Sequence, residues 1–259
     1  MQVRHLTLAV ALALAPVLVM ATATAAQSAA EHIAMGDQAY AALEPAVAVK
    51  HYEAAIEADS LSYEALWKAS RSLVDMAEYE ESAEQRRAWF RSAEAYSHRA
   101  VAAEPNDAEG HFGLARSLGR VALTVGVRDR VKYAGDVRAH ALEALRFDPN
   151  HPGALHVMGR WNAEVMRVSG FARFMAKTFL GGKVFDTASW AEARRFMEKA
   201  VEVDPDRLTH HLDLAEILAD MGEKAKAREQ FEIVARGQPR DVNDPHYKRE
   251  AERALARLR

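Results

Sequence analysis

The chain has 259 residues, no cysteine and a formal net charge of −3 at pH 7. The lack of cysteine excludes disulfides and attachment to a membrane as a lipoprotein. A mildly acidic composition is not typical of nucleic-acid-binding proteins, so we expect no nucleic-acid partner.

The N-terminal segment 1–25 has the features of a secretion signal. Arg4 gives a positive start, Leu6 to Met20 is almost entirely apolar, and Ala23 and Ala25 are small residues of the kind that signal peptidase reads. An apolar run of about 15 residues is short for a membrane span of about 20. We therefore expect cleavage and export to the periplasm. The alternative is an uncleaved segment that anchors the protein in a membrane.

The rest of the chain is punctuated by acidic–proline corners that follow alanine-rich helical runs. The step from Pro205 to Pro239 is 34 residues, the length of one tetratricopeptide repeat (TPR). Valine and isoleucine rarely alternate with polar residues, so no strand is expected. The spacing predicts an all-α fold, a TPR-type solenoid of antiparallel helical hairpins. The corners are Glu104-Pro105, Asp148-Pro149 and Asp204-Pro205.

We expect residues 26–259 to form a single solenoid domain of five repeats and a terminal helix. Such arrays need a polar outer cap to stay soluble, and the arginine-rich C-terminus fits that role. The predicted units are 29–62, 63–107, 108–151, 152–207 and 208–241, followed by a capping helix over 245–259.

The repeat pattern alternates small and bulky residues so that two helices pack closely. In the first unit Gly36 and Ala39 are expected on one helix, and Ala48, Tyr52 and Ala55 on the other. The three middle units hold about 10, 10 and 22 residues more than 34 between their two helices. These extra residues either lengthen the helices or project from one edge as a binding surface.

Charge is distributed unevenly along the repeats. Residues 31–110 carry 16 acidic and 7 basic residues, a net charge of −9. Residues 111–185 carry 5 acidic and 12 basic residues, a net charge of +7, and residues 186–259 carry 16 and 14, a net charge of −2. The basic middle is expected to help bind a partner.

The segment from Val165 to Phe185 is basic, contains no acidic residue and has phenylalanines at helical spacing. A basic amphipathic helix can lie on a membrane interface or cover an anionic ligand. Alternatively, its phenylalanines fill the groove of the array, and both interpretations can hold together. The predicted ligand contacts are the cations and aromatics of this region: Arg160, Trp161, Arg167, Phe171, Arg173, Phe174, Lys177 and Phe179.

Two of these residues have structural alternatives. Arg160 is either a groove cation for an anionic group or the partner of Glu164 at i+4 on the same helix. Trp161 is either a core residue or part of the groove lining. Both alternatives stay open from the sequence.

No motif indicates catalysis, a cofactor or a metal. His210, His211 and Asp213 are close in sequence, but neighbouring helical residues point to different faces. The chain has no glycine-rich phosphate loop, nucleophile elbow or His-Glu-x-x-His motif. We therefore expect no catalytic residues, no cofactor and no metal site, and a protein that is not an enzyme.

Three stretches resemble a known family. They are the run from His156 to Trp161, the insert ending in Thr178 to Gly182, and the helix that leads to Asp204-Pro205. Together they resemble the TPR domain of the regulator of microtubule dynamics proteins, mainly over residues 105–259. The resemblance implies a helical array with a groove that, in a mitochondrial member, binds and transfers phospholipids. The microtubule and organelle-tethering roles of the eukaryotic members are not carried over.

These observations predict an exported scaffold that binds a protein or peptide partner through its concave groove, without catalysis. The alternative is binding or transfer of a phospholipid or other anionic amphiphile, or contact with a membrane surface, by the groove and the 165–185 insert.

Overall fold

A computed structural model describes residues 28–179 and 182–258 of the chain. The expected secretion signal, residues 1–25, lies outside the described residues, as do Leu180 and Gly181 at the end of the insert. A helix over 28–41 precedes α2 (Pro45–Ala58), α3 (Tyr63–Ala77), α4 (Ala83–Ala103), α5 (Ala108–Ala122) and α6 (Val127–Phe147). After α6 the chain forms α7 (Pro152–Arg167), α8 (Gly170–Phe179), the 3-10 helix η1 (Gly182–Thr187), α9 (Trp190–Val203), α10 (Leu208–Asp220), α11 (Lys224–Arg236) and α12 (Asp244–Arg257).

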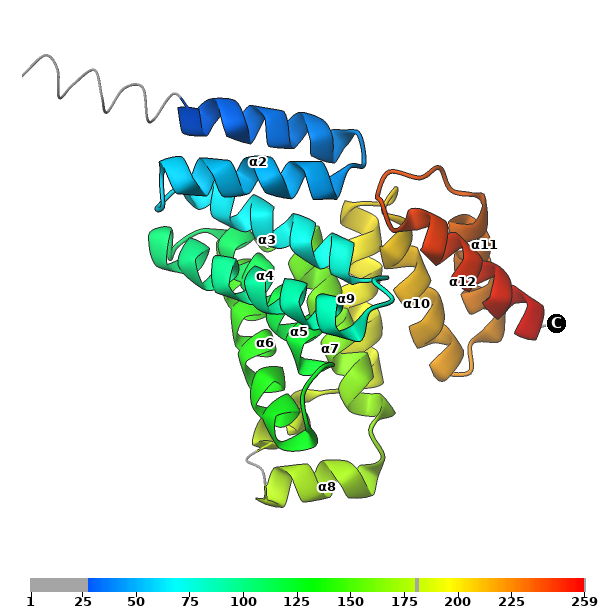
Figure 1. Ribbon diagram of the computed structural model, residues 1–259. Helices are drawn as coiled ribbons and strands as arrows, with labels where there is room; N and C mark the ends of the chain where they lie inside the picture. Colours follow the sequence, from blue (N-terminus) through cyan, green and yellow to red (C-terminus); the bar gives the residue numbers. More distant parts are fainter. Residues whose placement is uncertain (1–27, 180–181, 259) are drawn as a thin grey trace, which may run out of the picture.

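The helices form hairpins that stack side by side into a curved array (Figure 1). The hairpins are the helix over 28–41 with α2, then α3 with α4, α5 with α6, α7 with α9, and α10 with α11. No strand occurs in the described residues. The prediction of an all-α helical-hairpin solenoid is confirmed.

The acidic–proline corners end helices, as the sequence predicts. Glu104, Asp148 and Asp204 are the C-cap residues of α4, α6 and α9, and all three have left the helical conformation. A proline disfavours the helical conformation of the residue before it, so each helix ends at its corner. The next helix then begins after a short turn, which holds the two helices antiparallel.

Packing between helices follows the pattern of small and bulky residues. A Cβ atom added at Gly36 would lie 2.4 Å from Cε1 of Tyr52, and the Tyr52 side chain is fully buried. The Tyr52 hydroxyl donates a hydrogen bond to Asp37, at 2.8 Å. Glycine is therefore needed at position 36 because the tyrosine ring lies directly against the backbone of its partner helix.

The two smaller insertions lengthen the second helices of their hairpins. Helices α4 and α6 each have 21 residues, whereas α2 has 14, α9 has 14 and α11 has 13. The first helices α3 and α5 have 15 residues each. The extra residues therefore extend regular helix, which is one of the two alternatives that the sequence left open.

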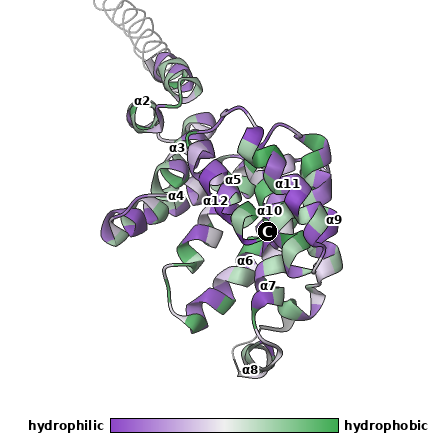
Figure 2. Cartoon of the chain, turned by 90° about the vertical axis from the view of Figure 1, so that its right-hand side faces the viewer, coloured by the Kyte–Doolittle hydropathy of each residue, from purple (hydrophilic) through white to green (hydrophobic). Residues whose placement is uncertain are grey.

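The long insertion forms separate structure between α7 and α9. Helix α8 lies at one end of the molecule, away from the stacked hairpins and next to η1, as Figure 1 and Figure 2 show. Its link to the array includes Arg173, whose guanidinium donates hydrogen bonds to the carbonyl oxygens of Val165 and Met166, at 3.1 and 2.9 Å. These carbonyls belong to the last turn of α7, where cations are favourable. Among the described residues, no helix combines the length and apolar character needed to cross a bilayer.

The C-terminal helix returns to contact the second hairpin. The Asn243 side-chain amide donates to the Asp75 carbonyl oxygen at 3.0 Å, and the Tyr79 hydroxyl donates to Glu250 at 3.0 Å. The rings of Tyr79 and His246 stack with their centroids 3.9 Å apart. The predicted capping helix therefore contacts the second hairpin as well as the neighbouring fifth hairpin.

Candidate binding site on the inner face

The inner face is the surface formed by the first helices of the second to fifth hairpins, α3, α5, α7 and α10. Ion pairs join neighbouring first helices across this face. They include Asp75 with Arg116, Glu78 with Arg120, Asp213 with Arg160, and Asp220 with Arg167. A further pair joins Arg207 to Asp241, which lies just before α12.

The pairs between α3 and α5 are the most buried. Arg116 lies 2.5 Å from an oxygen of Asp75, whose side chain is 1% exposed. Burial alone would lower the pKa of Arg116, but attraction to Asp75 and Glu78 outweighs it, and the pKa is raised. Arg120 lies 2.5 Å from Glu78. Removing one member of such a pair would leave an uncompensated buried charge, which is strongly destabilising.

A second group joins α7 to α10. The Arg160 guanidinium donates to both oxygens of Asp213, at 3.0 and 3.2 Å, and His156 Nε2 lies 2.9 Å from the same carboxylate. Burial would raise the pKa of Asp213, but Arg160 and His156 hold it well below its usual range. His156 also contacts His210 through their Nδ1 atoms, 2.9 Å apart.

These pairs neutralise four arginines of the basic middle of the chain. Arg116 and Arg120, from the basic middle of the chain, are neutralised by acids of the preceding block. Arg160 and Arg167 are neutralised by acids of the following block. A good part of the basic middle is therefore committed to holding the repeats together.

The inner face is hollowed into a chamber of about 260 Å³. This is smaller than the roughly 300–1,000 Å³ of sites for drug-sized ligands, so it suits a single side chain or a small ion. Its walls come from the two residues just after α3 and from α5, α7, α10 and α12. The lining residues are Glu78, Tyr79, Arg120, Arg160, Thr209, Leu212, Asp213, Glu216, Tyr247 and Glu250.

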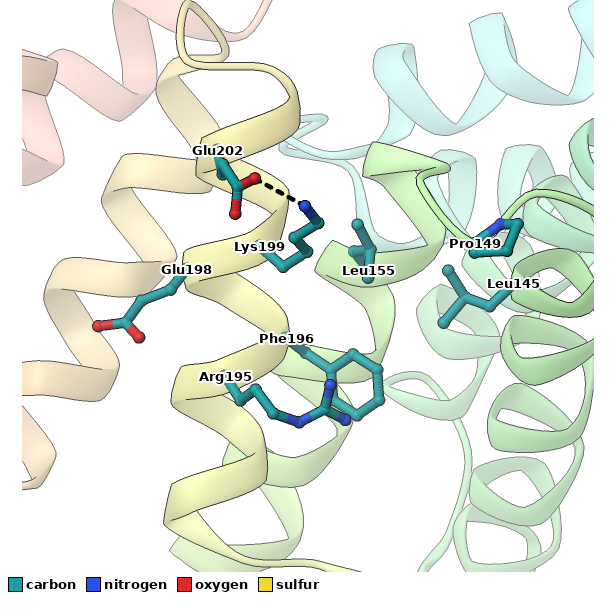
Figure 3. Close-up of a pocket in the computed structure, with 8 residues that line it drawn as sticks. All are labelled: Leu145, Pro149, Leu155, Arg195, Phe196, Glu198, Lys199 and Glu202. Carbon is teal, nitrogen blue, oxygen red and sulfur yellow. Dashed lines mark hydrogen bonds and ion pairs between the residues drawn. The ribbon is translucent and has the colours of Figure 1, made fainter.

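A larger hollow of about 480 Å³ lies over α7, between α6 and α9. Figure 3 shows Leu145, Leu155 and Phe196 on its apolar side, with Lys199 turned toward Glu202 of its own helix. Arg195 lies over the Phe196 ring, with its guanidinium carbon 4.1 Å from the ring centroid, and pairs with Glu192. The two basic side chains of this hollow, Arg195 and Lys199, are thus both paired with acidic residues of α9. Within the part of the chain that the structure describes, the hollow therefore offers no unpaired charged side chain that would select one ligand.

The predicted ligand contacts whose side chains the structure describes lie in several places. Arg160 lines the chamber. It pairs with Glu164 at 3.5 Å, as one alternative from the sequence predicted, and more closely with Asp213, at 3.0 Å. Arg167 binds Glu164 and the acids of α10. Trp161 is buried, with its indole N–H donating to the carbonyl of Ala134 at 2.7 Å, so it belongs to the core.

The remaining predicted contacts lie on α8. Arg173 caps α7, and the Phe174 side chain is 58% exposed. Phe171, Lys177 and Phe179 are also on this helix, but their side chains lie outside the described part of the structure. Phe185, at the η1 end of the insert, packs against Trp161, with ring centroids 6.4 Å apart.

The sequence did not single out most of the chamber residues. Glu78 and Tyr79 follow α3, and Tyr247 and Glu250 lie on the predicted capping helix. The sequence feature that could have predicted them is the regular placement of charged residues on the first helices. This regularity is visible only when the repeats are aligned with one another.

The paired histidine motif has a packing role. His211 is buried, and its Nε2 lies 2.8 Å from the carbonyl oxygen of Pro205, at the corner before α10. His111 makes the equivalent contact with Pro105, at 3.0 Å. Within the described residues no group of three or more potential ligands converges on a metal site.

The stacked hairpins and their inner face define a TPR protein. A thermophilic TPR protein of Thermus thermophilus has a similar structure, with a TM-score of 0.63 and 18% identity over 86% of this chain and 98% of that one. PilF of Pseudomonas aeruginosa has a TM-score of 0.53 and 14% identity, over 91% of this chain and 90% of that one. At these identities the likeness shows the fold alone.

Within this class, the sequence model of regulator of microtubule dynamics protein 1-3 matches residues 30–259, so the chain belongs to this family. Mouse regulator of microtubule dynamics protein 1 is 25% identical over 150 residues, which are 58% of this chain and 48% of the mouse protein. Bovine regulator of microtubule dynamics protein 3 is 25% identical over 174 residues, 65% of this chain and 36% of the bovine protein. The chain thus spans about half the length of these relatives or less, and the predicted resemblance is confirmed.

The buried histidine of α10 predicts that the protein loses stability in mild acid. Burial first, and then His156, lower the pKa of His210 to about 2. A histidine in the unfolded chain titrates near 6.5, so below that pH the unfolded state binds a proton that the folded state does not. We expect His210 to remove up to about 2 kcal/mol of unfolding free energy between pH 7 and pH 5.

Urea denaturation at pH 7 and pH 5 measures this effect. His210→Gln should show a smaller loss of stability between the two pH values than the wild type. His98→Gln, at an exposed position on α4, is the matched control and should keep the wild-type difference. An unchanged difference in His210→Gln would show that acid acts on other groups.

Proposed function

We propose that this protein is a non-catalytic scaffold that holds a peptide segment of a protein partner at the inner-face chamber. The observation that carries the proposal is the chamber itself, where residues from the end of the second hairpin's first helix (Glu78 and Tyr79, just after α3) and from α5, α7, α10 and α12 surround one polar hollow. A TPR array binds partners by presenting a preformed surface, and peptide recognition reuses such surfaces.

The inner face is preorganised for this role. Its arginines are held by neighbouring helices through ion pairs such as Arg120 with Glu78 and Arg160 with Asp213. Side chains that are already fixed lose little conformational entropy when a partner binds. The inner face therefore favours partner peptides of one particular shape over a wide range of partners that it would have to adapt to.

A photocrosslinker placed in the chamber tests the proposal. Peptides of 12 residues are first selected from a random display library on the purified protein. Benzoylphenylalanine at Thr209, which lines the chamber, should crosslink to the selected peptides. The same group at Ile233, which is 42% exposed on α11, should not. Peptides that crosslink at position 233 and not at 209 would place recognition elsewhere and refute the proposal.

Export to the periplasm is part of the same proposal. It is supported by the basic start, the apolar run to Met20 and the small residues Ala23 and Ala25. Intact-mass measurement of the protein purified from its own cells should give a chain that begins at Ala26. An N-terminus at Met1 in a membrane fraction would support the anchored alternative instead.

A second candidate function is binding of an anionic amphiphile or membrane surface by the insert. The observation in its favour is that Phe174 is 58% exposed and Val168 is 43% exposed, beside a basic helix. Exposed aromatics on such a helix can enter a lipid interface.

Flotation with vesicles of anionic phospholipid separates this candidate from the first. If the insert contacts lipid, Phe174→Asp should reduce the bound fraction severalfold, because a charge replaces an apolar anchor. Leu61→Asp is the control, since Leu61 is 75% exposed in the turn between α2 and α3. Equal flotation of both variants and the wild type, or no flotation at all, would remove this candidate.

A further inference from the structure

The chamber on the inner face has more carboxylates than cations in its lining. Four carboxylates line it, on Glu78, Asp213, Glu216 and Glu250, together with two guanidinium groups, on Arg120 and Arg160. Each arginine is already paired, Arg120 with Glu78 at 2.5 Å and Arg160 with Asp213 at 3.0 Å.

The two remaining carboxylates differ in their partners. Glu216 is 3.3 Å from Arg167, a residue outside the chamber lining. Glu250 accepts a hydrogen bond from the Tyr79 hydroxyl, at 3.0 Å. Among the described side chains, no cationic group lies within 4.0 Å of Glu250. Glu250 is therefore the carboxylate that lacks a counter-charge.

A second observation concerns Glu78, another carboxylate of the chamber lining. The Oε2 atom of Glu78 is buried and has no hydrogen-bond partner among the described residues, and the Glu78 side chain is only 10% exposed. Arg116 lies 4.0 Å from this oxygen, beyond hydrogen-bond distance. A buried acceptor without a donor costs free energy, which a ligand with N–H groups would recover.

The walls of the chamber also suit a flat cation. Tyr79 and Tyr247 lie together at one side, with their ring centroids 5.9 Å apart. Aromatic rings attract cations, and a planar guanidinium can stack on a ring while it binds carboxylates through several N–H groups. Burial, and to a lesser extent the negative charge of Asp213, raise the pKa of Glu216.

We propose that the chamber receives the basic side chain of the partner peptide, an arginine by preference, with its guanidinium bound by Glu78 and Glu250 beside Tyr79. This inference rests on the proposed function, because it names the group that the scaffold recognises. An acidic or phosphorylated side chain would meet the unpaired Glu250, and the volume of about 260 Å³ is too small for a lipid.

Defined peptides test the charge preference directly. The probes are acetyl-Ala-Arg-Ala-amide, its citrulline counterpart, which is neutral with nearly the same shape, and its glutamate counterpart. Binding is measured by nuclear magnetic resonance titration of the ¹⁵N-labelled protein. We expect the arginine peptide to bind at least about tenfold more tightly than the citrulline peptide, which corresponds to about 1.4 kcal/mol.

The matched variants are Glu250→Gln and Glu252→Gln. Both remove one negative charge from α12, but Glu250 lines the chamber and Glu252 is exposed. Glu250→Gln should abolish the preference for arginine over citrulline, while Glu252→Gln should leave it intact. A glutamine at 250 still accepts the Tyr79 hydroxyl hydrogen bond, so the fold is expected to persist. If Glu250→Gln does not fold, Glu216→Gln is the second variant, because it also removes one negative charge from the chamber lining and should weaken the preference for arginine.

The outcomes separate this inference from the proposed function. If display-selected peptides crosslink at position 209 but bind Glu250→Gln as well as the wild type, the inference is overturned and the scaffold proposal stands. A preference for the glutamate peptide would overturn the inference as well. Binding of free spermidine without any binding of the arginine peptide would also overturn it, because the site would then serve a small cation. If no peptide crosslinks at position 209, the proposed function itself fails.

Discussion

The architecture depends on buried ion pairs between first helices of different repeats. Arg116 on α5 holds Asp75 on α3, and Arg160 on α7 holds Asp213 on α10. A buried charge without its partner is strongly unfavourable, so each pair fixes how one hairpin sits on its neighbour. The second helices can change length freely as long as these contacts are kept. This explains why α4 and α6 are extended to 21 residues while α3 and α5 keep 15.

Local chemistry made the helices and their packing predictable from the sequence. The proline corners stop helices by direct steric effect, and the contact of Gly36 with Tyr52 follows from the repeat pattern. Within the long insert, the helical spacing of the phenylalanines anticipated α8. The site was less predictable because its contacts join residues far apart in the chain. Asp75 and Arg116 are separated by 41 positions, and Arg160 and Asp213 by 53.

Aligned repeats do carry a usable signal for these contacts. Counted from the start of each predicted unit, the ninth residue is Arg71, Arg116, Arg160 or Glu216. The thirteenth is Asp75, Arg120, Glu164 or Asp220. Each of these positions is charged in every unit from the second to the fifth, with a sign that varies between units. Net charge summed over blocks concealed this alternation, and it suggested a free basic surface where the structure has arginines bound to neighbouring carboxylates.

The return of α12 to the second hairpin changes how such an array can unfold. In an open solenoid each repeat touches only its neighbours, so the terminal repeats can fray independently. Here the Asn243 amide binds the Asp75 carbonyl across 168 positions, and Glu250 binds Tyr79 across 171. Opening the C-terminal end therefore also removes contacts from the second hairpin. The two ends of the segment from α3 to α12 are coupled, which makes this segment behave more like a single cooperative globular domain than a chain of separable repeats.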